Sequence, residues 1–335
     1  MKGYRVGVVS PLSPFGQKIR RLLEEQALPT IELKLFDGEP GGGSTLTQFE
    51  DEVLITQPLD RDLFPSLDLM FVGEGTDPGV LAEAASASRQ GVLTFLAGTN
   101  ELAAPVAASG LNEKFLPADV RLVALPSAAS ILVAKVLDGL GESFEVAQAR
   151  ATVMLPASEL GEAAVRELHE QVVQILNFGS PPTEVLGEQL AFNLLLPPAK
   201  TTEGLLESSI AKEVAELTGL DADRVSIALV RAPIFHSYAL SLWVQLGEEP
   251  TLESLVTALG ERQGIDASEA LDPASVASPI RVAGSDRVQV GRAQADRACR
   301  GAFWLWVCAD SMAVDPVANS LALARRLLER DGTER

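Results

Sequence analysis

Cysteine and histidine are scarce in this sequence, which has two of each among its 335 residues. Two cysteines exclude a disulfide-stapled scaffold and a cysteine-rich zinc centre. Because the two histidines also lie far apart along the chain, the sequence predicts no metal site. Because the chain has only two cysteines, we expect both thiols to be reduced, as in a reducing compartment. The four residues are His169, His236, Cys299 and Cys308.

Basic residues and long apolar runs are also lacking. Lysine and arginine number 27 against 46 acidic residues, which gives a formal net charge of −19. Nucleic acids and anionic membranes need a basic face, so we expect neither as a partner. No apolar run approaches the roughly 20 residues that span a bilayer, and the run after Arg5 is too short for a signal peptide. We therefore expect a cytoplasmic protein.

Aromatic residues make up only 5% of the chain, although 47% of it is hydrophobic. The core must therefore be mainly aliphatic. A chain of 335 residues is too long for one ordinary core, so we expect two domains.

The first part of the chain alternates short apolar runs with helical patterns. A strand over 5–9 leads through a turn into a helix, and a second strand follows over 31–36. This order is typical of the opening of a doubly wound dinucleotide-binding domain. Further strands of the same kind are expected at 67–72, 92–96 and 121–125.

The glycine fingerprint of such a domain is damaged. Its three positions fall on Ser10, Ser13 and Gly16, so only the last is glycine, and Pro11 and Pro14 each remove an N–H donor. The loop is either a nucleotide site or a scaffold whose cofactor site has decayed. Asp37, after the second strand, is either a ribose ligand or a turn residue. The candidate cofactor contacts are Ser10, Leu12, Ser13, Pro14, Phe15 and Gly16.

The second part of the chain has longer strands with its helices grouped apart, which favours an α+β domain. Between the two parts, the segment 122–137 reads as a buried strand, a break at Pro126 and Ser127, and an apolar helix from Ile131. A helix N-terminus after a tight turn is a common place to mount a nucleophile. The middle of this elbow is Ala128, which can do no chemistry, and Ser130 is most simply an N-cap.

Several segments, in order along nearly the whole chain, resemble the aspartate-semialdehyde dehydrogenase family. The most specific is AGSDRVQVGR at 283–292. The others are VGVV with Gly16-Gln17, the elbow at 122–137, AFN at 191–193, RAP at 231–233 and LWVCAD at 305–310.

The resemblance implies a fold and a partner. It implies an α/β Rossmann-type NADP-binding domain, residues 1–130 completed by a C-terminal helix at 316–335. It also implies an α+β dimerisation and substrate domain, residues 131–315, and hence a homodimer. In the family a cysteine thiolate attacks the aldehyde, hydride passes to NADP, and phosphate displaces the acyl group.

Carried over residue by residue, most of the machinery for that reaction is replaced. The cysteine position of the elbow is Ala128, and the base position is Tyr238. A tyrosine, with a pKa of about 10, is a poor base at neutral pH unless that pKa is shifted. The substrate arginine is retained as Arg231, with Glu207 as the nearby acid. The family's Gln-x-x-Ser-Gly loop becomes Leu155-Pro-Ala-Ser158-Glu159.

No other side chain is a clear substitute for the family's nucleophile or base. His236 lies two residues before Tyr238 and would share its face on a strand, as a displaced base or as a polar residue at a domain edge. We expect His169 to face solvent, Cys308 to be a buried inert thiol and Cys299 to lie at the surface.

These observations lead to the hypothesis of a homodimeric, catalytically depleted relative with a weakened NADP site and an unknown small-molecule ligand. Two alternatives stay open. One is an active NADP-dependent oxidoreductase of amino-acid biosynthesis with a non-cysteine mechanism, using Tyr238 or His236 as acid. The other is a non-enzymatic partner of a homodimer or heterodimer.

Overall fold

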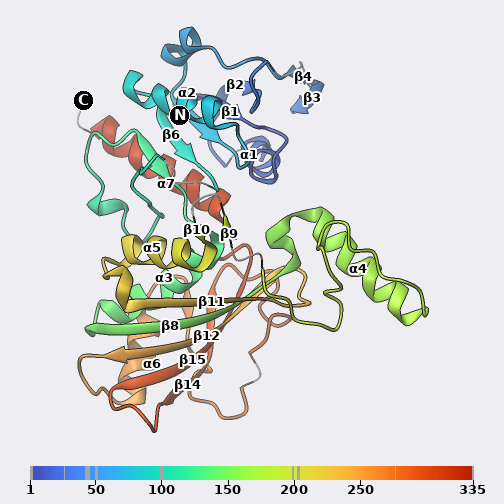
Figure 1. The fold of residues 1–335 in the computed structure, drawn as a ribbon. Coiled ribbons are helices and arrows are strands. Elements are labelled where there is room, and N and C mark those ends of the chain that lie inside the picture. Colours follow the sequence, from blue (N-terminus) through green and yellow to red (C-terminus); the bar gives the residue numbers. More distant parts are fainter. Residues whose placement is uncertain are drawn as a thin grey trace. The chain divides into compact units, whose positions relative to one another are not determined.

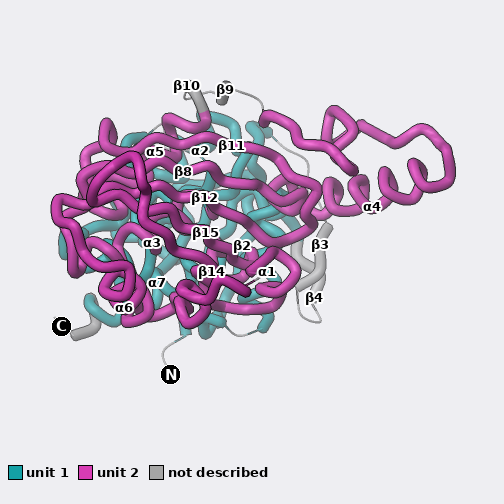
Figure 2. The backbone as a smooth tube through the Cα atoms, turned by 90° about the horizontal axis from the view of Figure 1, so that it is seen from below, with its two compact units in different colours: residues 1–127, 316–335 teal, residues 128–315 magenta. Residues whose placement is uncertain are grey.

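The protein was examined as a computed structural model (Figure 1). The structure describes residues 3–25, 27–41, 46–49, 52–98, 102–197, 200–201, 204–275 and 277–333. The chain forms two compact units, shown in Figure 2: unit 1 comprises residues 1–127 and 316–335, and unit 2 comprises residues 128–315.

Unit 1 is built on a five-stranded parallel sheet of order β2-β1-β5-β6-β7. Its strands are β1 (Tyr4–Val9), β2 (Thr30–Phe36), β5 (Leu69–Val72), β6 (Leu93–Leu96) and β7 (Leu122–Ala124). Strands β5 and β6 are buried at every residue, which explains their continuous apolar sequences. The prediction of a Rossmann-type sheet is confirmed. The strand order reverses between β1 and β5, where such sheets bind ligands.

The helices of unit 1 pack on this sheet and share its core. They are α1 (Pro14–Glu24), α2 (Pro78–Ser86) and α7 (Pro316–Thr333), with short 3-10 turns η1 (Arg61–Ser66), η2 (Ala87–Gln90) and η3 (Glu113–Phe115). A small hairpin, β3 (Leu46–Phe49) and β4 (Glu52–Ile55), lies between β2 and η1 in the chain. In the core the Phe71 and Phe95 rings stack with centroids 5.3 Å apart.

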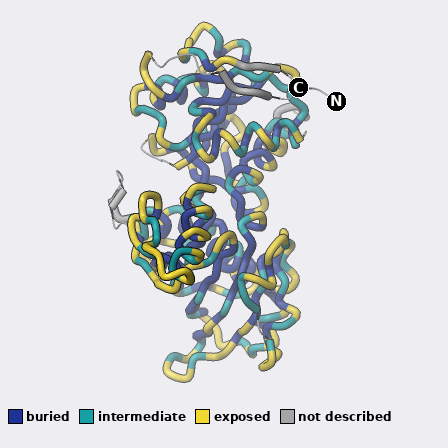
Figure 3. The backbone as a smooth tube through the Cα atoms, turned by 90° about the vertical axis from the view of Figure 1, so that its right-hand side faces the viewer, coloured by how far each residue is buried: buried dark blue, intermediate teal, exposed yellow. Residues whose placement is uncertain are grey.

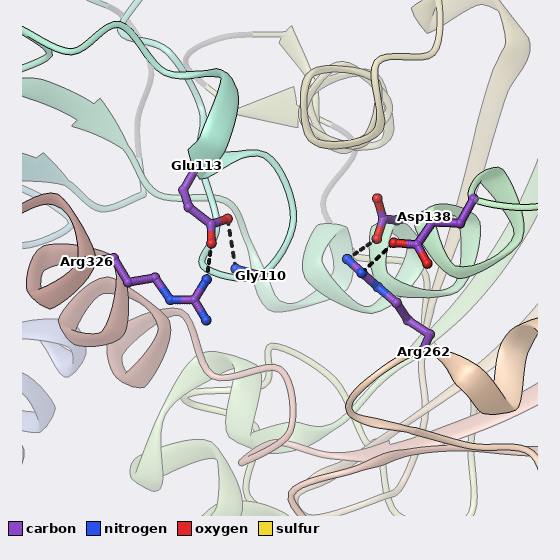
Figure 4. A network of polar contacts seen from close by, with 6 residues as sticks. Gly110, Glu113, Asp138, Arg262 and Arg326 are labelled. Atoms are coloured by element: carbon purple, nitrogen blue, oxygen red, sulfur yellow. Dashed lines mark hydrogen bonds and ion pairs between the residues drawn. The ribbon is translucent and has the colours of Figure 1, made fainter. Parts of the chain in front are cut away.

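Helix α7, far away in the sequence, belongs to unit 1. Its residues Val317, Leu321 and Leu323 join the same core cluster as the sheet. Arg326 pairs with Glu113, whose carboxylate also accepts from the backbone N–H of Gly110 at 2.9 Å (Figure 4). These contacts close unit 1 with a segment that follows unit 2 in the chain.

Unit 2 is built on a six-stranded mixed sheet of order β11-β8-β12-β15-β14-β13. Helices α3, α5 and α6 pack with it around an aliphatic core, as predicted for an α+β domain. On α3, Asp138 pairs with Arg262 (Figure 4). The strands are β8 (Val146–Leu155), β11 (Val225–Arg231), β12 (Ser237–Leu246), β13 (Ile265–Asp266), β14 (Val288–Ala295) and β15 (Ala302–Asp310). The helices are α3 (Ala128–Gly141), α5 (Leu206–Thr218) and α6 (Leu252–Glu261), and smaller elements are η4 (Ala157–Leu160), η5 (Ala222–Arg224), β9 (Lys200–Thr201) and β10 (Gly204–Leu205).

Side chains on the sheet surface of unit 2 are partly exposed. Trp304 is 40% exposed, and the indoles of Trp243 and Trp304 both donate to one Asp296 oxygen, at 2.7 and 3.2 Å. The Arg150 guanidinium lies 4.7 Å from the centre of the Trp243 ring. Trp304 is therefore exposed on this surface, whereas Trp243, at 6% exposure, is buried.

Helix α4 (Glu162–Leu176) forms an arm that projects from the rest of unit 2 (Figure 1). The segment after it folds back onto α4 through buried polar side chains. Glu167 accepts from the N–H groups of Val185 and Leu186, and Gln171 accepts from those of Leu190 and Ala191. Figure 3 shows buried residues along both sheets and exposed residues on the outer segments.

Candidate functional site

The elbow joins β7 to α3 through Leu125, Pro126 and Ser127. Helix α3 begins at Ala128, three residues before the predicted start at Ile131. The methyl group of Ala128 is 7% exposed and belongs to the core of unit 2. The side chain at the start of this helix is thus an inert packing group.

The expectation that Ser130 caps the helix is wrong. Because α3 starts earlier, Ser130 is its third residue and is fully buried. Its hydroxyl donates to the carboxylate of Glu213 on α5, at 2.5 Å. The Ser130 side chain therefore ties two helices together.

The base position carries a hydrogen-bonded tyrosine. Tyr238 is the second residue of β12 and is 3% exposed. Its hydroxyl donates to the carboxylate of Glu159, which follows β8. Burial raises the pKa of Tyr238 well above 10, and the neighbouring Glu159 charge adds to the rise. The hydroxyl is therefore held protonated, which moves it further from the role of a base.

Glu159 is the partner that sequence reasoning missed. In the sequence, this loop was noticed only because it lacks the family's Gln-x-x-Ser-Gly pattern. The residue keeps access to solvent, but the surrounding protein reduces hydration of its carboxyl group and raises its pKa. The Tyr238 hydrogen bond and the positive charge of Arg231 oppose that rise.

Arg231 ends β11 and is 6% exposed. Burial lowers the pKa of its guanidinium, and the charge of Glu159 raises it. Its Nε atom has no hydrogen-bond partner within the part of the chain that the structure describes. A buried cationic N–H of this kind is an available donor for an anion.

The prediction that His236 shares a strand face with Tyr238 is wrong. Strand β12 starts at Ser237, so His236 lies before it and is exposed, whereas Tyr238 is buried. Glu207, the second candidate for substrate binding, lies half-buried in the first turn of α5. Among the described residues, no hydrogen bond or ion pair joins Glu207 to Arg231 or Tyr238.

The candidate cofactor loop begins at Ser10, whose φ of +54° is unusual for a residue other than glycine. Leu12 is 51% exposed, Pro14 is the first residue of α1, and Phe15 and Gly16 are buried. Ser13 caps α1 by accepting from the N–H of Gly16 at 3.0 Å. A carboxylate from the next loop, Glu74, accepts from the N–H of Phe15 at 2.9 Å.

The remaining candidates occupy ordinary structural positions. Asp37 follows β2, where its carboxylate accepts from the N–H of Glu39 at 3.3 Å, as a turn residue does. Burial raises the pKa of Cys308 to about 12, so this thiol is inert. Cys299 is partly exposed, and His169 is exposed on α4, as predicted.

Two features of the described residues bear on metal binding and on membrane insertion. Their His, Cys, Asp and Glu side chains form no group of three or more that would hold a metal ion. In the same part of the chain, no helix has the length and apolarity needed to cross a membrane.

The AGSDRVQVGR segment has structural reasons for its glycines. Gly284 has a φ of +77° in the turn before β14. Gly291 lies at a bulge in β14, and a Cβ there would approach the Ala277 side chain to 1.9 Å. The motif that carries the resemblance most specifically is thus a fold signature.

Comparisons with known proteins agree with these features. The family described as "Semialdehyde dehydrogenase, dimerisation domain" matches residues 137–313. An aspartate-semialdehyde dehydrogenase of Prochlorococcus marinus is 24% identical, over 97% of this chain and 96% of its own. A USG-1 protein homolog of Pseudomonas aeruginosa is 26% identical, over 97% of each chain.

The fold is shared with a solved structure. That structure is aspartate semialdehyde dehydrogenase II of Vibrio cholerae complexed with ASA, which has a TM-score of 0.81, 22% identity and coverage of 99% of both chains. The family match covers more than half of the chain. The chain therefore belongs to the semialdehyde dehydrogenase family, and its relatives include aspartate-semialdehyde dehydrogenases that match along nearly its whole length.

Proposed function

We propose that this chain is a homodimeric member of the family that no longer converts aspartate semialdehyde to an acyl phosphate. The observation that supports this most directly is Ala128 at the start of α3. The family reaction passes through a thioester, and a methyl group can form no covalent bond to the aldehyde carbon. Without that thioester, phosphate has no acyl carbon to attack and no thiolate to displace, so no acyl phosphate can form.

The surroundings of the base position support the same proposal. A general base must accept a proton near neutral pH. The Tyr238 hydroxyl is already protonated and donates a hydrogen bond to the Glu159 carboxylate. The raised pKa also weighs against Tyr238 as the acid of a non-thiol hydride transfer. A hydroxyl with a raised pKa is a weaker acid and gives up its proton less readily.

Arg231 supports retained binding of a small anion. Its guanidinium is buried, and Nε lacks a partner among the described residues. A buried donor without a partner costs folding free energy. A carboxylate ligand that accepts a hydrogen bond from this N–H would therefore bind favourably. We propose that the ligand of unit 2 is a small carboxylate that binds without reacting.

The homodimer is supported by the arm of α4 and the segment that returns from it. Phe178 is completely exposed and Phe192 is 67% exposed, and both have positive φ, at 57° and 61°. Such backbone conformations are costly outside glycine, and exposed apolar groups of this size mark interaction surfaces. Leu176, Leu194 and Leu196 extend the exposed apolar set.

An assay with aspartate semialdehyde, phosphate and NADP tests the catalytic proposal. We expect no phosphate-dependent NADPH formation from the wild type. The matched control carries Ala128→Cys together with Tyr238→His, which restores both reactive groups. Turnover by the wild type above its substrate-free blank contradicts the proposal, whatever the double variant does.

Light scattering coupled to size exclusion tests the dimer. We expect the wild type to elute with twice the chain mass and Phe178→Asp to shift towards the monomer. Phe115 is 78% exposed in unit 1, so Phe115→Asp is the matched control and should leave the dimer intact. A monomeric wild type contradicts this part of the proposal.

A further inference from the structure

We propose that Glu74 closes the dinucleotide-phosphate position of unit 1 with its own carboxylate, so that this Rossmann-type unit excludes NADP. The family resemblance implies that cofactor, and the residues present do not fit it. The inference goes beyond the catalytic proposal, because it concerns binding in unit 1 and makes no use of Ala128.

The carboxylate of Glu74 lies where the fold would place a phosphate. Glu74 follows β5 and reaches the N-terminus of α1, which follows β1. The strand order reverses between these two strands, and doubly wound sheets bind their ligand at that point. A helix N-terminus carries partial positive charge and attracts an anion. Glu74 supplies that anion from within the chain.

The N–H groups that would bind a phosphate already have partners. The Phe15 N–H donates to both Glu74 oxygens, at 2.9 and 3.3 Å, and the Ser13 hydroxyl donates to Glu74 at 3.3 Å. The Gly16 N–H donates to the Ser13 hydroxyl, and the Ser13 N–H donates to the Ser10 carbonyl at 3.1 Å. Pro14 has no N–H. A pyrophosphate would have to displace this set of bonds.

The loops around Glu74 are also in close contact. A Cβ on Gly16 would lie 2.3 Å from the Ser10 carbonyl oxygen, and one on Gly73 would lie 2.3 Å from the Ser13 hydroxyl. The Ser10 hydroxyl lies 2.6 Å from that of Thr76, which in turn donates to the Gly73 carbonyl at 2.8 Å. The loops after β1 and β5 are thereby hydrogen-bonded to each other across the position that a dinucleotide phosphate would take.

Charge completes the exclusion. A dinucleotide brings negative phosphates, and Glu74 is an acid held at the position they would take. A phosphate in contact with Glu74 would meet a like charge, and we expect this to weaken dinucleotide binding by at least about tenfold. The sequence signal for this arrangement is Gly73-Glu-Gly75, a small-residue turn with one acid at the end of a buried strand.

Titration of the full-length protein with NADPH, followed by cofactor fluorescence, tests the inference. We expect no saturation for the wild type, and binding at least about tenfold tighter in Glu74→Ala and Glu74→Gln. Glu25→Gln is the matched control, because it removes one charge at the opposite end of α1, where Glu25 is exposed. Wild-type affinity equal to that of the Glu74 variants overturns the inference, as does failure of both folded variants to bind.

A second measurement keeps the inference testable if Glu74→Ala folds poorly. Inorganic pyrophosphate should raise the thermal midpoint of the isosteric Glu74→Gln by displacing its neutral amide from the Phe15 N–H, and should leave the wild type unchanged. An equal shift in both proteins, or no shift in either, overturns the inference. Because NADP exclusion would by itself prevent NADPH formation, the dehydrogenase assay is repeated in the Glu74→Gln background. There the cofactor can bind, so absence of turnover tests Ala128 separately from this inference.

Discussion

Two strand–turn–helix junctions in this protein have the same architecture but differ in the side chain found at the start of the helix. At the start of α1, the anion position is filled by Glu74, which accepts hydrogen bonds from Phe15 and Ser13. At the start of α3, the nucleophile position is reduced to the methyl group of Ala128. The two proposals thus rest on opposite observations: a carboxylate that occupies one helix start and an unreactive methyl group at the other. An occupying side chain leaves no gap in the residue pattern, so only the structure draws attention to it.

Overpacking the α1 junction should have the largest effect on stability. Gly16→Ala would place a Cβ within 2.3 Å of the Ser10 carbonyl and 2.7 Å of the Pro11 Cα. Backbone atoms cannot move aside cheaply, so we expect a loss of about 3 kcal/mol in the free energy of unfolding of unit 1. Calorimetry measures it. Gly260→Ala, which meets nothing within 4 Å in helix α6, is the control and should be neutral or slightly stabilising.

The α3 junction should be sensitive to the loss of a buried polar contact. In Ser130→Ala, the Glu213 carboxylate loses the hydroxyl that lies 2.5 Å away. Hydrogen bonds to charged groups contribute roughly 1.5–3 kcal/mol, so we expect unit 2 to lose about 2 kcal/mol. The same calorimetric scan detects this. An unchanged midpoint would mean that Ser130 does not tie α3 to α5.

Removing the occupant of the α1 junction should cost less. Glu74→Ala takes away an acceptor at a helix N-terminus, and comparable caps contribute about 1 kcal/mol. We expect that loss in urea unfolding of unit 1. A loss as large as that of Gly16→Ala would show that Glu74 is needed for packing and would weaken the comparison with Ala128.

The smallest effect at neutral pH should come from Tyr238→Phe, which leaves ring packing intact. Because Glu159 is exposed, water can replace the hydrogen bond that its carboxylate loses. Because burial raises the pKa of Tyr238 well above 10, the folded protein keeps this proton after the unfolded chain has released it. Stability from this source is complete below about pH 10 and falls by about 1.4 kcal/mol per pH unit above it. Thermal scans from pH 8 to 11 should show that slope in the wild type and a shallower one in the variant.

Absorbance offers an independent check on Tyr238. The chain has two tyrosines, so Tyr4→Phe leaves Tyr238 as the only one. We expect no tyrosinate absorbance at pH 10 until the protein unfolds. Ionisation of folded protein at that pH would contradict the burial of the hydroxyl.

Local sequence patterns predicted the scaffold well. The five parallel strands of unit 1 were legible because strands buried on both faces, such as β5, read as short apolar runs. The start of α3 was misplaced because Ala128, Ala129 and Ser130 look like a turn. Their small side chains instead form the first turn of the helix.

The side chains that fill the two sites were not predictable in the same way. Glu74 acts on Phe15 across 59 residues, and Glu159 acts on Tyr238 across 79. Neither separation has a periodic signal. Comparison with the family does not reveal Glu159 as a partner of Tyr238 either, because Glu159 lies in a loop that is noticed only for lacking the family motif. Contacts of this range depend on strand order, which a local pattern does not contain.

The placement of the indoles has a practical consequence. All three tryptophans of the chain, Trp243, Trp304 and Trp306, lie within residues 128–315. Intrinsic fluorescence therefore reports the melting of that unit directly, whereas circular dichroism sums over the whole chain. Unfolding of unit 1 alone would lower the ellipticity before the tryptophan emission of unit 2 shifted, so the two signals together tell which unit a substitution has destabilised.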